Sequence, residues 1–388
     1  MSESLKPVEP APIPLFDLKR QERRLRPELD KAIAAVLDHG QFILGPEVTA
    51  LETALAAFSG VRHCIAVSSG RDALLMALMA MGVGPGDAVF VPAFTFSATA
   101  AAVMAAGARP IFVDVLLDSA NMDPEDLERA IADTDGLAGA TPKAIIPVDL
   151  FGLPANYGAI GAIAAEHGLT ILADAAQSFG GAVGNARVGA FGSISAVSFY
   201  PTKPLGGYGD GGAVMTDDDT LAEAVRQIRT HGRAGDGDVA MRIGLTGRLD
   251  TIQAAIINVK LAGFAAELER RTEVAALYDS LLPASVARPV VPAGVRSAYA
   301  LYTVRVPARD AVRASLAAAD IGTGLFYRVP LHRHPAFEPL VPPHRSFPIA
   351  DFLSDTVLSL PMGPDVTDAE VERVARAVAA AVGAPLPA

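Results

Sequence analysis

Short apolar runs alternate with helical segments along the first half of the chain, and this alternation is what most constrains the fold. Strands are expected at residues 64–67, 88–91, 111–114, 144–148 and 170–173. Helical patterns or alanine-rich runs lie between them, as at residues 71–81 and 98–106. Repeated strand–helix units form a mostly parallel sheet with helices on both faces. The sequence therefore predicts an α/β fold.

Different patterns flank this alternating region. Residues 1–22 form a proline-rich N-terminal arm, and residues 23–262 are expected to form the large domain. An apolar helix starting near residue 249 should run towards Phe264, and a separate charged helix should follow at 267–282.

A smaller α+β domain is expected over residues 263–388. Strands are predicted at 299–306 and 322–327, and helices at 311–319 and 367–381. Thr367 and Glu370 have the spacing of a capping box, which opens the last helix.

Composition excludes several classes of protein. A chain of 388 residues with 51% apolar content can bury a large core. Its net charge of -11 argues against nucleic acid as a partner, because phosphate backbones are held by broad basic surfaces. A single cysteine, Cys64, excludes intrachain disulfides and cysteine-based metal clusters, and we expect it to be buried.

Targeting and membrane signals are weak. The N-terminus lacks the basic start and apolar core of a signal peptide. The longest apolar run, residues 93–108, is shorter than the roughly 20 residues that a membrane span needs. We expect a soluble cytoplasmic protein with no metal site.

One lysine lies in an unusual setting. Lys203 occupies a glycine-rich turn between apolar strands at 194–199 and 213–216, whereas the other five lysines fall in helices, in tails or beside polar residues. An amine held against apolar walls favours its neutral form, which can form a Schiff base with a carbonyl. A surface lysine or an anion-binding lysine would also fit this turn.

The glycines after Lys203 formally match a dinucleotide-binding fingerprint. Gly207, Gly209 and Gly212 have the G-x-G-x-x-G spacing, but a strand follows them where the fingerprint requires a helix. We reject a nicotinamide site here.

A second glycine-containing turn predicts an anion site. Ser68, Ser69 and Gly70 join the strand at 64–67 to the helix at 71–81. The free amide groups at a helix start suit a phosphate, although an ordinary strand–helix turn has the same pattern.

Polar and aromatic side chains follow other strand ends, where ligands bind in sheets of this kind. Phe96 follows the strand at 88–91, and Asp174 and Gln177 follow the strand at 170–173. Asp174 would be costly if buried unpaired, so it should face a cation unless it is a plain helix cap. A Schiff-base lysine, a phosphate site, this carboxylate and an aromatic ring are the requirements of pyridoxal phosphate.

Four motifs carry a family resemblance. They begin at Asp174 (Asp-Ala-Ala-Gln-Ser), Ser198 (Ser-Phe-x-x-x-Lys-Pro-Leu-Gly), Gly209 (Gly-Asp-Gly-Gly) and Gly247 (Gly-Arg-Leu-Asp-Thr-Ile-Gln-Ala-Ala). Together they resemble the DegT/DnrJ/EryC1/StrS family of nucleotide-sugar aminotransferases, over nearly the whole chain. The resemblance implies fold type I of the pyridoxal-phosphate-dependent transferases. It is greatest to members that act on UDP-linked 3-keto-N-acetylglucosaminuronic acid.

The resemblance also implies roles for individual residues. Lys203 would form the Schiff base and move protons, Asp174 would pair with the pyridinium nitrogen, Gln177 with the phenolic oxygen, and Phe96 would stack on the ring. The phosphate would be held by Gly70, Arg71 and Ser198.

Further implications concern the partners. The protein would be a homodimer with shared active sites, in which Thr246 reaches the cofactor phosphate of the neighbouring subunit. L-glutamate would donate the amino group and a nucleotide-linked keto-sugar would accept it. Candidate substrate-binding residues are Arg248, Tyr327 and His332, and Arg248 also fits a structural ion pair.

Three positions depart from the family pattern. Thr246 stands where asparagine is common, Arg71 where threonine is usual, and Phe326 where the most similar subgroup has histidine. The first two lie beside the expected phosphate, and the third beside the expected sugar pocket.

Two alternatives remain open at this stage. An aminotransferase of the same fold could act on a cyclitol or another ketone or aldehyde without a nucleotide. A non-catalytic regulator could keep the cofactor as a ligand, although no appended DNA-binding module or basic tail supports that role.

Overall fold

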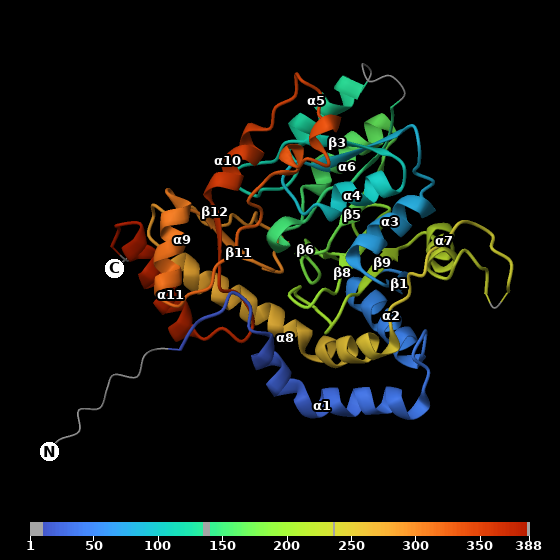
Figure 1. The fold of residues 1–388 in the computed structure, drawn as a ribbon, viewed down its shortest axis with the longest axis horizontal. Coiled ribbons are helices and arrows are strands. Elements are labelled where there is room, and N and C mark those ends of the chain that lie inside the picture. Colours follow the sequence, from blue (N-terminus) through green and yellow to red (C-terminus); the bar gives the residue numbers. More distant parts are fainter. Residues whose placement is uncertain (1–10, 135–139, 236, 386–388) are drawn as a thin grey trace.

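A seven-stranded sheet lies at the centre of the computed structural model, which describes residues 11–134, 140–235 and 237–385 (Figure 1). The strands are β1 (His63–Val67), β2 (Asp87–Pro92), β3 (Arg109–Val113), β4 (Thr141–Ile145), β5 (Thr170–Asp174), β8 (Ile194–Ser198) and β9 (Gly212–Thr216). Their order is β1-β9-β8-β5-β4-β2-β3, and β9 runs antiparallel to both of its neighbours while the other pairs are parallel. The predicted α/β fold with a mostly parallel sheet is confirmed. Residues 1–10 of the predicted N-terminal arm lie outside the described residues.

Helices cover both faces of the sheet, as the alternation of strands and helices predicted. One face packs against α3 (Gly70–Ala80), α4 (Ala98–Ala105) and α7 (Asp219–Arg229). The other packs against α2 (Pro46–Ser59), α5 (Pro124–Thr134), α6 (Tyr157–His167) and α8 (Thr251–Leu281).

Strand β1 shows how residues are divided between these faces. Ile65 and Val67 belong to the core cluster of α3, whereas Cys64 and Ala66 belong to that of α2, because successive side chains of a strand point to opposite faces. Cys64 is buried, as predicted. Both faces of the sheet are covered, so the central residues of most of its strands are apolar and buried.

Helix α8 is a single helix of 31 residues, and the prediction of two separate helices is wrong. Gly263 lies at the expected break, but its position is open and carries no strain, so the helix continues through it. The predicted domain boundary at 262/263 therefore falls inside α8. This helix is long and apolar enough to cross a membrane by length and composition. Half of its most apolar window is buried, however, and it packs against α1 (Leu18–His39), α2 and α11 (Asp368–Ala381).

The C-terminal part contains a two-stranded antiparallel sheet and three α-helices. The strands are β11 (Tyr302–Arg305) and β12 (Val357–Leu360), and the helices are α9 (Arg309–Ala318), α10 (Pro348–Thr356) and α11 (Asp368–Ala381). The capping box of Thr367 and Glu370 is present at the start of α11. The prediction of a strand at 322–327 is wrong, because this segment makes only an isolated bridge between Gly324 and Ser359.

Small elements connect these parts. The third sheet contains β10 (Val295–Arg296), β6 (Ala182–Val183) and β7 (Ala186–Arg187). Short 3₁₀ helices cover Leu150–Gly152, Leu331–Arg333 and Glu338–Leu340.

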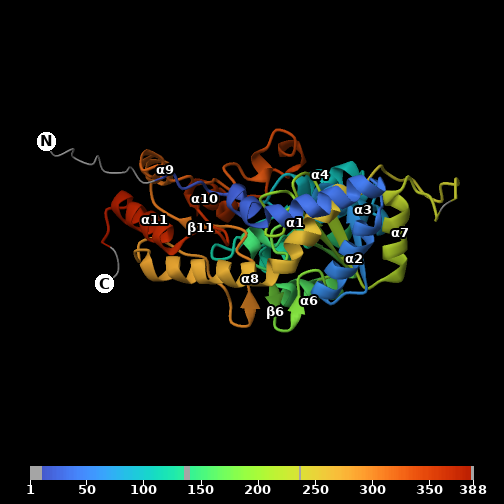
Figure 2. The same ribbon diagram turned by 90° about the horizontal axis from the view of Figure 1, so that it is seen from below.

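The first helix, α1 (Leu18–His39), lies along α8 in both views (Figures 1 and 2). It begins at Leu18, where the Asp17 carboxylate accepts hydrogen bonds from the amides of Lys19 and Arg20 and so caps the helix. The Arg20 guanidinium then forms a bidentate pair with Glu370 at 2.8 and 2.6 Å. This pair joins the start of α1 to the start of α11.

The Arg20–Glu370 pair predicts a pH-dependent contribution to stability. Its hydrogen bonds lower the pKa of Glu370 from 4.5 to about 2. A lowered carboxyl pKa stabilises the fold above the unfolded value, and this stabilisation is lost as the pH falls from 4.5 towards about 2. The variant Arg20→Met should therefore lower the unfolding free energy at neutral pH by about 1–2 kcal/mol, and by progressively less as the solution is acidified.

Urea unfolding over a pH series measures this difference. Arg26→Met is a matched control, because Arg26 pairs with Glu22 and Asp30 on the exposed face of the same helix. The proposed role of the Arg20–Glu370 pair would be contradicted if both substitutions lowered the unfolding free energy equally. It would also be contradicted if the loss caused by Arg20→Met did not become smaller on acidification.

Candidate active site

The C-terminal ends of β5 and β8 bring Asp174 and Lys203 together. Asp174 is the last residue of β5 and is 5% exposed, and Lys203 lies in the turn that follows β8. Burial raises the pKa of Asp174 and lowers the pKa of Lys203, and each charge opposes the shift of the other. A buried carboxylate and a half-buried amine thus lie near enough for each charge to affect the pKa of the other.

Hydrogen bonds fix the Asp174 carboxylate. The Thr99 hydroxyl of α4 donates to Oδ2 at 2.8 Å, and the Ala176 amide donates to Oδ1 at 3.3 Å. A buried carboxylate needs such donors, and an additional cationic partner stabilises it further. This arrangement suits the protonated nitrogen of a heteroaromatic ring.

Gln177 links the end of β5 to the C-terminal part of the chain. Its Oε1 accepts a hydrogen bond from the Phe151 amide at 2.8 Å, and its Nε2 donates to the Tyr327 hydroxyl at 3.1 Å. Burial raises the pKa of Tyr327, so its phenol stays neutral at physiological pH. The structure therefore brings together two residues that were predicted separately, one for the cofactor and one for the substrate.

Aromatic rings line the same region. The ring centroids of Phe96 and Tyr327 are 6.0 Å apart, and those of Phe94 and Tyr327 are 6.2 Å apart. Phe96 is 57% exposed, so its side chain has surface free to contact a planar ligand.

The turn before α3 forms a close-packed cradle. Ser69 caps the helix by accepting a hydrogen bond from the Asp72 amide at 3.0 Å. A Cβ atom at Gly70 would lie 2.6 Å from the Cβ of Ser198, so only glycine lets the two backbones approach this closely. The amides of Gly70 and Arg71 open the helix, where they have no partner within it. The cradle fits a phosphate, and the Ser198 hydroxyl lies beside it.

The Arg71 side chain does not turn into this cradle. It is exposed, and its guanidinium lies 3.6 Å from the Asp72 carboxylate. Arg71 can bind a phosphate through its backbone amide. Arginine in place of the usual threonine therefore leaves the helix start unchanged.

Thr246 and Arg248 lie on the segment beside the end of β1. Thr246 is exposed, with its hydroxyl 3.4 Å from His231 Nε2, and Arg248 bridges Val67 through its backbone. Neither side chain contacts Asp174 or Lys203 within the part of the chain that the structure describes.

His332 contacts helix α10 and the residue that precedes it. Its Nε2 is 2.9 Å from Asp351 of α10, and its ring packs 4.6 Å from Phe347. Burial lowers the pKa of His332, and Asp351 opposes this shift. These contacts join its side chain to α10, while the amide of the preceding residue, Leu331, donates to the Ala93 carbonyl at 2.8 Å.

The sequence analysis did not identify Asp149, which is hydrogen-bonded to the backbone of Asp174. Asp149 is fully buried and accepts hydrogen bonds from Ser178, Ala155 and Tyr157 at 2.6–2.8 Å, while its amide donates to the Asp174 carbonyl at 3.0 Å. Burial raises its pKa to about 7. Asp149 closes an apolar run just as Asp174 does, and this shared pattern was the available signal.

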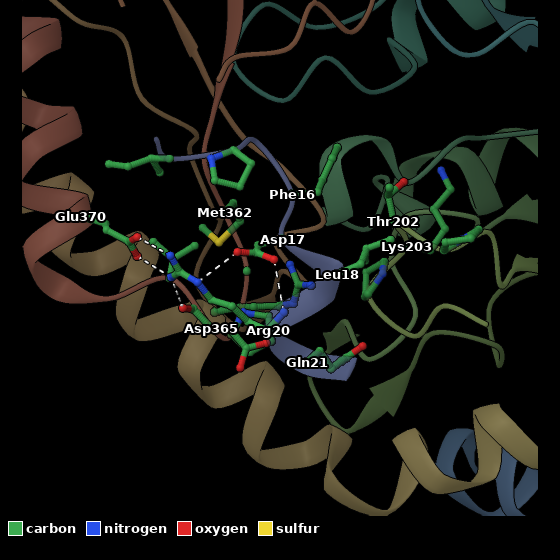
Figure 3. Close-up of a pocket in the computed structure, with 18 residues that line it drawn as sticks. Phe16, Asp17, Leu18, Arg20, Gln21, Thr202, Lys203, Met362, Asp365 and Glu370 are labelled. Atoms are coloured by element: carbon green, nitrogen blue, oxygen red, sulfur yellow. Dashed lines mark hydrogen bonds and ion pairs between the residues drawn. The ribbon is translucent and has the colours of Figure 1, made fainter. Parts of the chain in front are cut away.

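A small cavity adjoins the lysine turn. Its volume is about 50 Å³, and it is bounded by the start of α1, the segment before α11 and residues 201–204. In Figure 3, Thr202 and Lys203 lie on the side opposite Glu370, with Phe16 and Asp17 between them. The N-terminal arm and the C-terminal part therefore meet beside the lysine.

The residues present fit pyridoxal phosphate. Asp174 suits the pyridinium nitrogen, the start of α3 suits the phosphate, and Lys203 is an amine whose neutral form burial favours. When bound, this cofactor supplies an electron sink for chemistry at an amino-acid carbon. Fold and site together define a pyridoxal-phosphate-dependent enzyme of fold type I.

Comparison with known proteins agrees with this assignment to the pyridoxal-phosphate-dependent enzymes of fold type I. Residues 23–379 match the model of the DegT/DnrJ/EryC1/StrS aminotransferase family, and the chain belongs to this family. It is a pyridoxal-phosphate-dependent aminotransferase.

Three similar proteins illustrate the relationship. UDP-2-acetamido-2-deoxy-3-oxo-D-glucuronate aminotransferase of Pseudomonas aeruginosa is 44% identical over 94% of this chain and 99% of its own. The crystal structure of a DegT DnrJ EryC1 StrS aminotransferase from Brucella abortus has a TM-score of 0.91 and 45% identity, covering 95% of this chain and 99% of that one. A Bacillus subtilis protein solved with bound cofactor PMP has a TM-score of 0.87 and 27% identity, covering 98% and 87%.

The Thr99–Asp174 hydrogen bond predicts a loss of both stability and cofactor binding in Thr99→Val. The substitution leaves a buried carboxylate oxygen without its donor, so the unfolding free energy should fall by about 1–3 kcal/mol. The pKa of Asp174 should rise further, which weakens its interaction with a cationic ring. Urea unfolding and spectroscopic titration with pyridoxal phosphate measure the two effects.

Thr53→Val provides the control, because Thr53 bonds only to the Thr49 carbonyl on an exposed face of α2. If Thr99→Val bound the cofactor as tightly as Thr53→Val, the hydrogen bond from Thr99 would not contribute to the interaction of Asp174 with the cofactor.

Proposed function

We propose that this protein transfers the amino group of L-glutamate to a nucleotide-linked keto-sugar, with Lys203 as its catalytic residue. The observation that carries the proposal is the placement of Lys203 and Asp174 after neighbouring strands, where burial shifts both pKa values towards the neutral forms and each charge opposes the shift of the other. Such a pairing is costly unless a ligand uses it.

Each residue of the site has a role in this proposal. Asp174 holds the ring nitrogen, the start of α3 and Ser198 hold the phosphate, and Phe96 covers the ring. The Gln177 oxygen is held by the Phe151 amide, and its amide nitrogen, which donates one hydrogen to the Tyr327 hydroxyl, would offer the other to the phenolic oxygen of the cofactor. Lys203 would accept a proton from the donor carbon, because a neutral amine can act as a base near physiological pH.

The acceptor we favour is UDP-linked 3-keto-N-acetylglucosaminuronic acid. The similarity to the Pseudomonas aeruginosa enzyme, over nearly the full length of both chains, supports this choice. An anionic sugar on an acidic protein needs local donors, and Arg248 and Tyr327 are suitable in type. Phe326 in place of a histidine makes this pocket more apolar, which leaves a cyclitol or another ketone as the alternative acceptor.

We also propose that the enzyme is a cytoplasmic homodimer with shared active sites. Exposed apolar side chains cluster on two segments: Phe42, Ile43 and Leu44 on one, and Val239, Met241 and Ile243 on the other. The first segment is joined to the start of α8 by the bridge between Ile43 and Asp250, which lies just beyond Thr246 and Arg248. Large exposed apolar surface favours a protein interface, and a second copy would bring Thr246 to the partner's phosphate.

The role of Lys203 predicts that Lys203→Ala loses transamination. The visible absorption of the protein with pyridoxal phosphate should change when L-glutamate is added without acceptor, because the cofactor keeps the amino group. Without the lysine this half-reaction should slow by at least about 100-fold, since a positioned base contributes 10²–10⁴-fold. Absorption spectroscopy during single turnover measures the rate.

Lys31→Ala is the matched control, because Lys31 is exposed on α1. A Lys203→Ala protein that still reacts with glutamate would refute the catalytic role. A wild-type band that glutamate leaves unchanged would instead point to another donor or to the non-catalytic alternative, and a panel of nucleotide keto-sugars would then distinguish acceptors.

The proposed interface predicts that Ile243→Asp dissociates the dimer. Ile243 is 82% exposed, so a charge there costs the isolated chain little, but it would be desolvated between two copies. Sedimentation should show a shift from dimer to monomer, with the dimer dissociation constant raised at least about tenfold. Val290→Asp, at an exposed apolar residue outside the two segments, should leave the dimer unchanged. Dissociation by both or by neither variant would exclude this interface.

A further inference from the structure

A fully buried lysine lies close to the turn that carries Lys203. Lys260 of α8 is 2% exposed and therefore less exposed than Lys203, although its position in a helix gave no sign of this. Its Nζ donates a hydrogen bond to the Gly206 carbonyl at 2.6 Å and lies 4.3 Å from the centre of the Tyr208 ring. Both partners belong to the glycine-rich segment that follows Lys203.

The same face of α8 contacts this segment again. Gln253, seven residues earlier and hence two helical turns away, accepts a hydrogen bond from the Tyr208 amide at 2.9 Å. A Cβ atom at Gly207 or Gly209 would lie 2.9 Å from the Gln253 amide group. These glycines therefore let the backbone lie directly against α8.

The segment in turn supports the residues just before Lys203. A Cβ atom at Gly206 would lie 2.5 Å from the Pro201 carbonyl oxygen and 2.7 Å from that of Tyr200, so the turn folds tightly back on itself. The Lys203 amide donates to the Tyr200 carbonyl at 2.8 Å, and the Gly207 amide donates to the Phe199 carbonyl at 2.8 Å. A continuous set of contacts thus runs from Lys260 through Gly206 to the backbone of Lys203.

From these contacts we infer that Lys260, assisted by Gln253, is a positioning residue that holds the turn so that the Lys203 amine faces Asp174. This inference rests on the proposed role of Lys203. Lys260 touches neither the cradle nor Asp174 among the described residues, so it acts through the backbone and not on the cofactor itself. An ammonium group is suited to this task because it can donate to a carbonyl and interact with an aromatic ring at once.

The charged groups around Lys260 are consistent with a structural role for its ammonium group. Burial lowers the pKa of Lys260 to about 8, and Glu267 on the same helix opposes the shift. Tyr208 faces Lys260 from the turn, and burial raises its pKa, with Glu22 of α1 and Glu267 adding to this. The buried amine is therefore retained at a cost, and its two contacts with the turn offset that cost.

The test compares Lys260→Met with Lys260→Arg in the full-length protein. Methionine keeps the apolar stem but removes the donor, so the turn should lose its anchor. We expect the dissociation constant of pyridoxal phosphate to rise about 10- to 100-fold, as is typical when a supporting contact of a bound group is removed. The rate at which added cofactor forms its Schiff-base absorption should fall as well, and Lys260→Arg should restore part of both.

Val274→Ala controls for general destabilisation, because Val274 is buried on the same helix in the core cluster of the C-terminal part. It should lower the melting temperature without changing cofactor affinity. If Lys260→Met bound and reacted like the wild type, or if Val274→Ala lost equal affinity at an equal loss of melting temperature, the inference would be overturned. Gln253→Leu, which removes the acceptor of the Tyr208 amide, provides the same comparison should Lys260→Met not fold.

Lys203→Ala, measured in parallel, separates this inference from the proposed function. If Lys203→Ala still formed the Schiff-base absorption, the role of Lys203 would fail. If Lys203→Ala lost it while Lys260→Met did not differ from the wild type, only the positioning role of Lys260 would fail.

Discussion

The electrostatic interaction of buried Asp174 with Lys203 is the one on which the rest of the site depends. Each group is placed where burial disfavours its charge, and neither would be stable there alone. Thr99 supplies a donor to Asp174, and Asp149 holds the backbone on which Asp174 sits. The parallel sheet makes the pairing possible, because β5 and β8 are neighbours and both end at the same edge.

Helix α8 connects this edge to the rest of the molecule. It packs against the sheet through residues such as Ile257, and its later part contributes Val274 to the C-terminal core. From the same part of the helix as Ile257, Gln253 and Lys260 contact the glycine-rich segment that follows Lys203. A single continuous helix gives these contacts a fixed spacing, which two separate helices would not.

Much of the site could be predicted from sequence because its signals are local. An aspartate that ends an apolar run, a lysine in a glycine-rich turn and a serine-glycine turn before a buried helix each occupy a few consecutive residues. Asp149 has the same local signal as Asp174 but no motif beside it, and Lys260 has the sequence context of an ordinary helical lysine. His332 was chosen by residue type, and its actual partner, Asp351, lies 19 residues away on another helix.

The sequence by itself determined the α/β architecture, the strand ends that carry Asp174 and Lys203, and the capping of the last helix, because hydrophobic period and turn chemistry are properties of neighbouring residues. The tertiary structure alone decided that Gln177 meets Tyr327, 150 residues later, and that Lys260 reaches Gly206, 54 residues earlier. Such contacts depend on how whole elements pack, and the spacing of residues along the chain does not encode them.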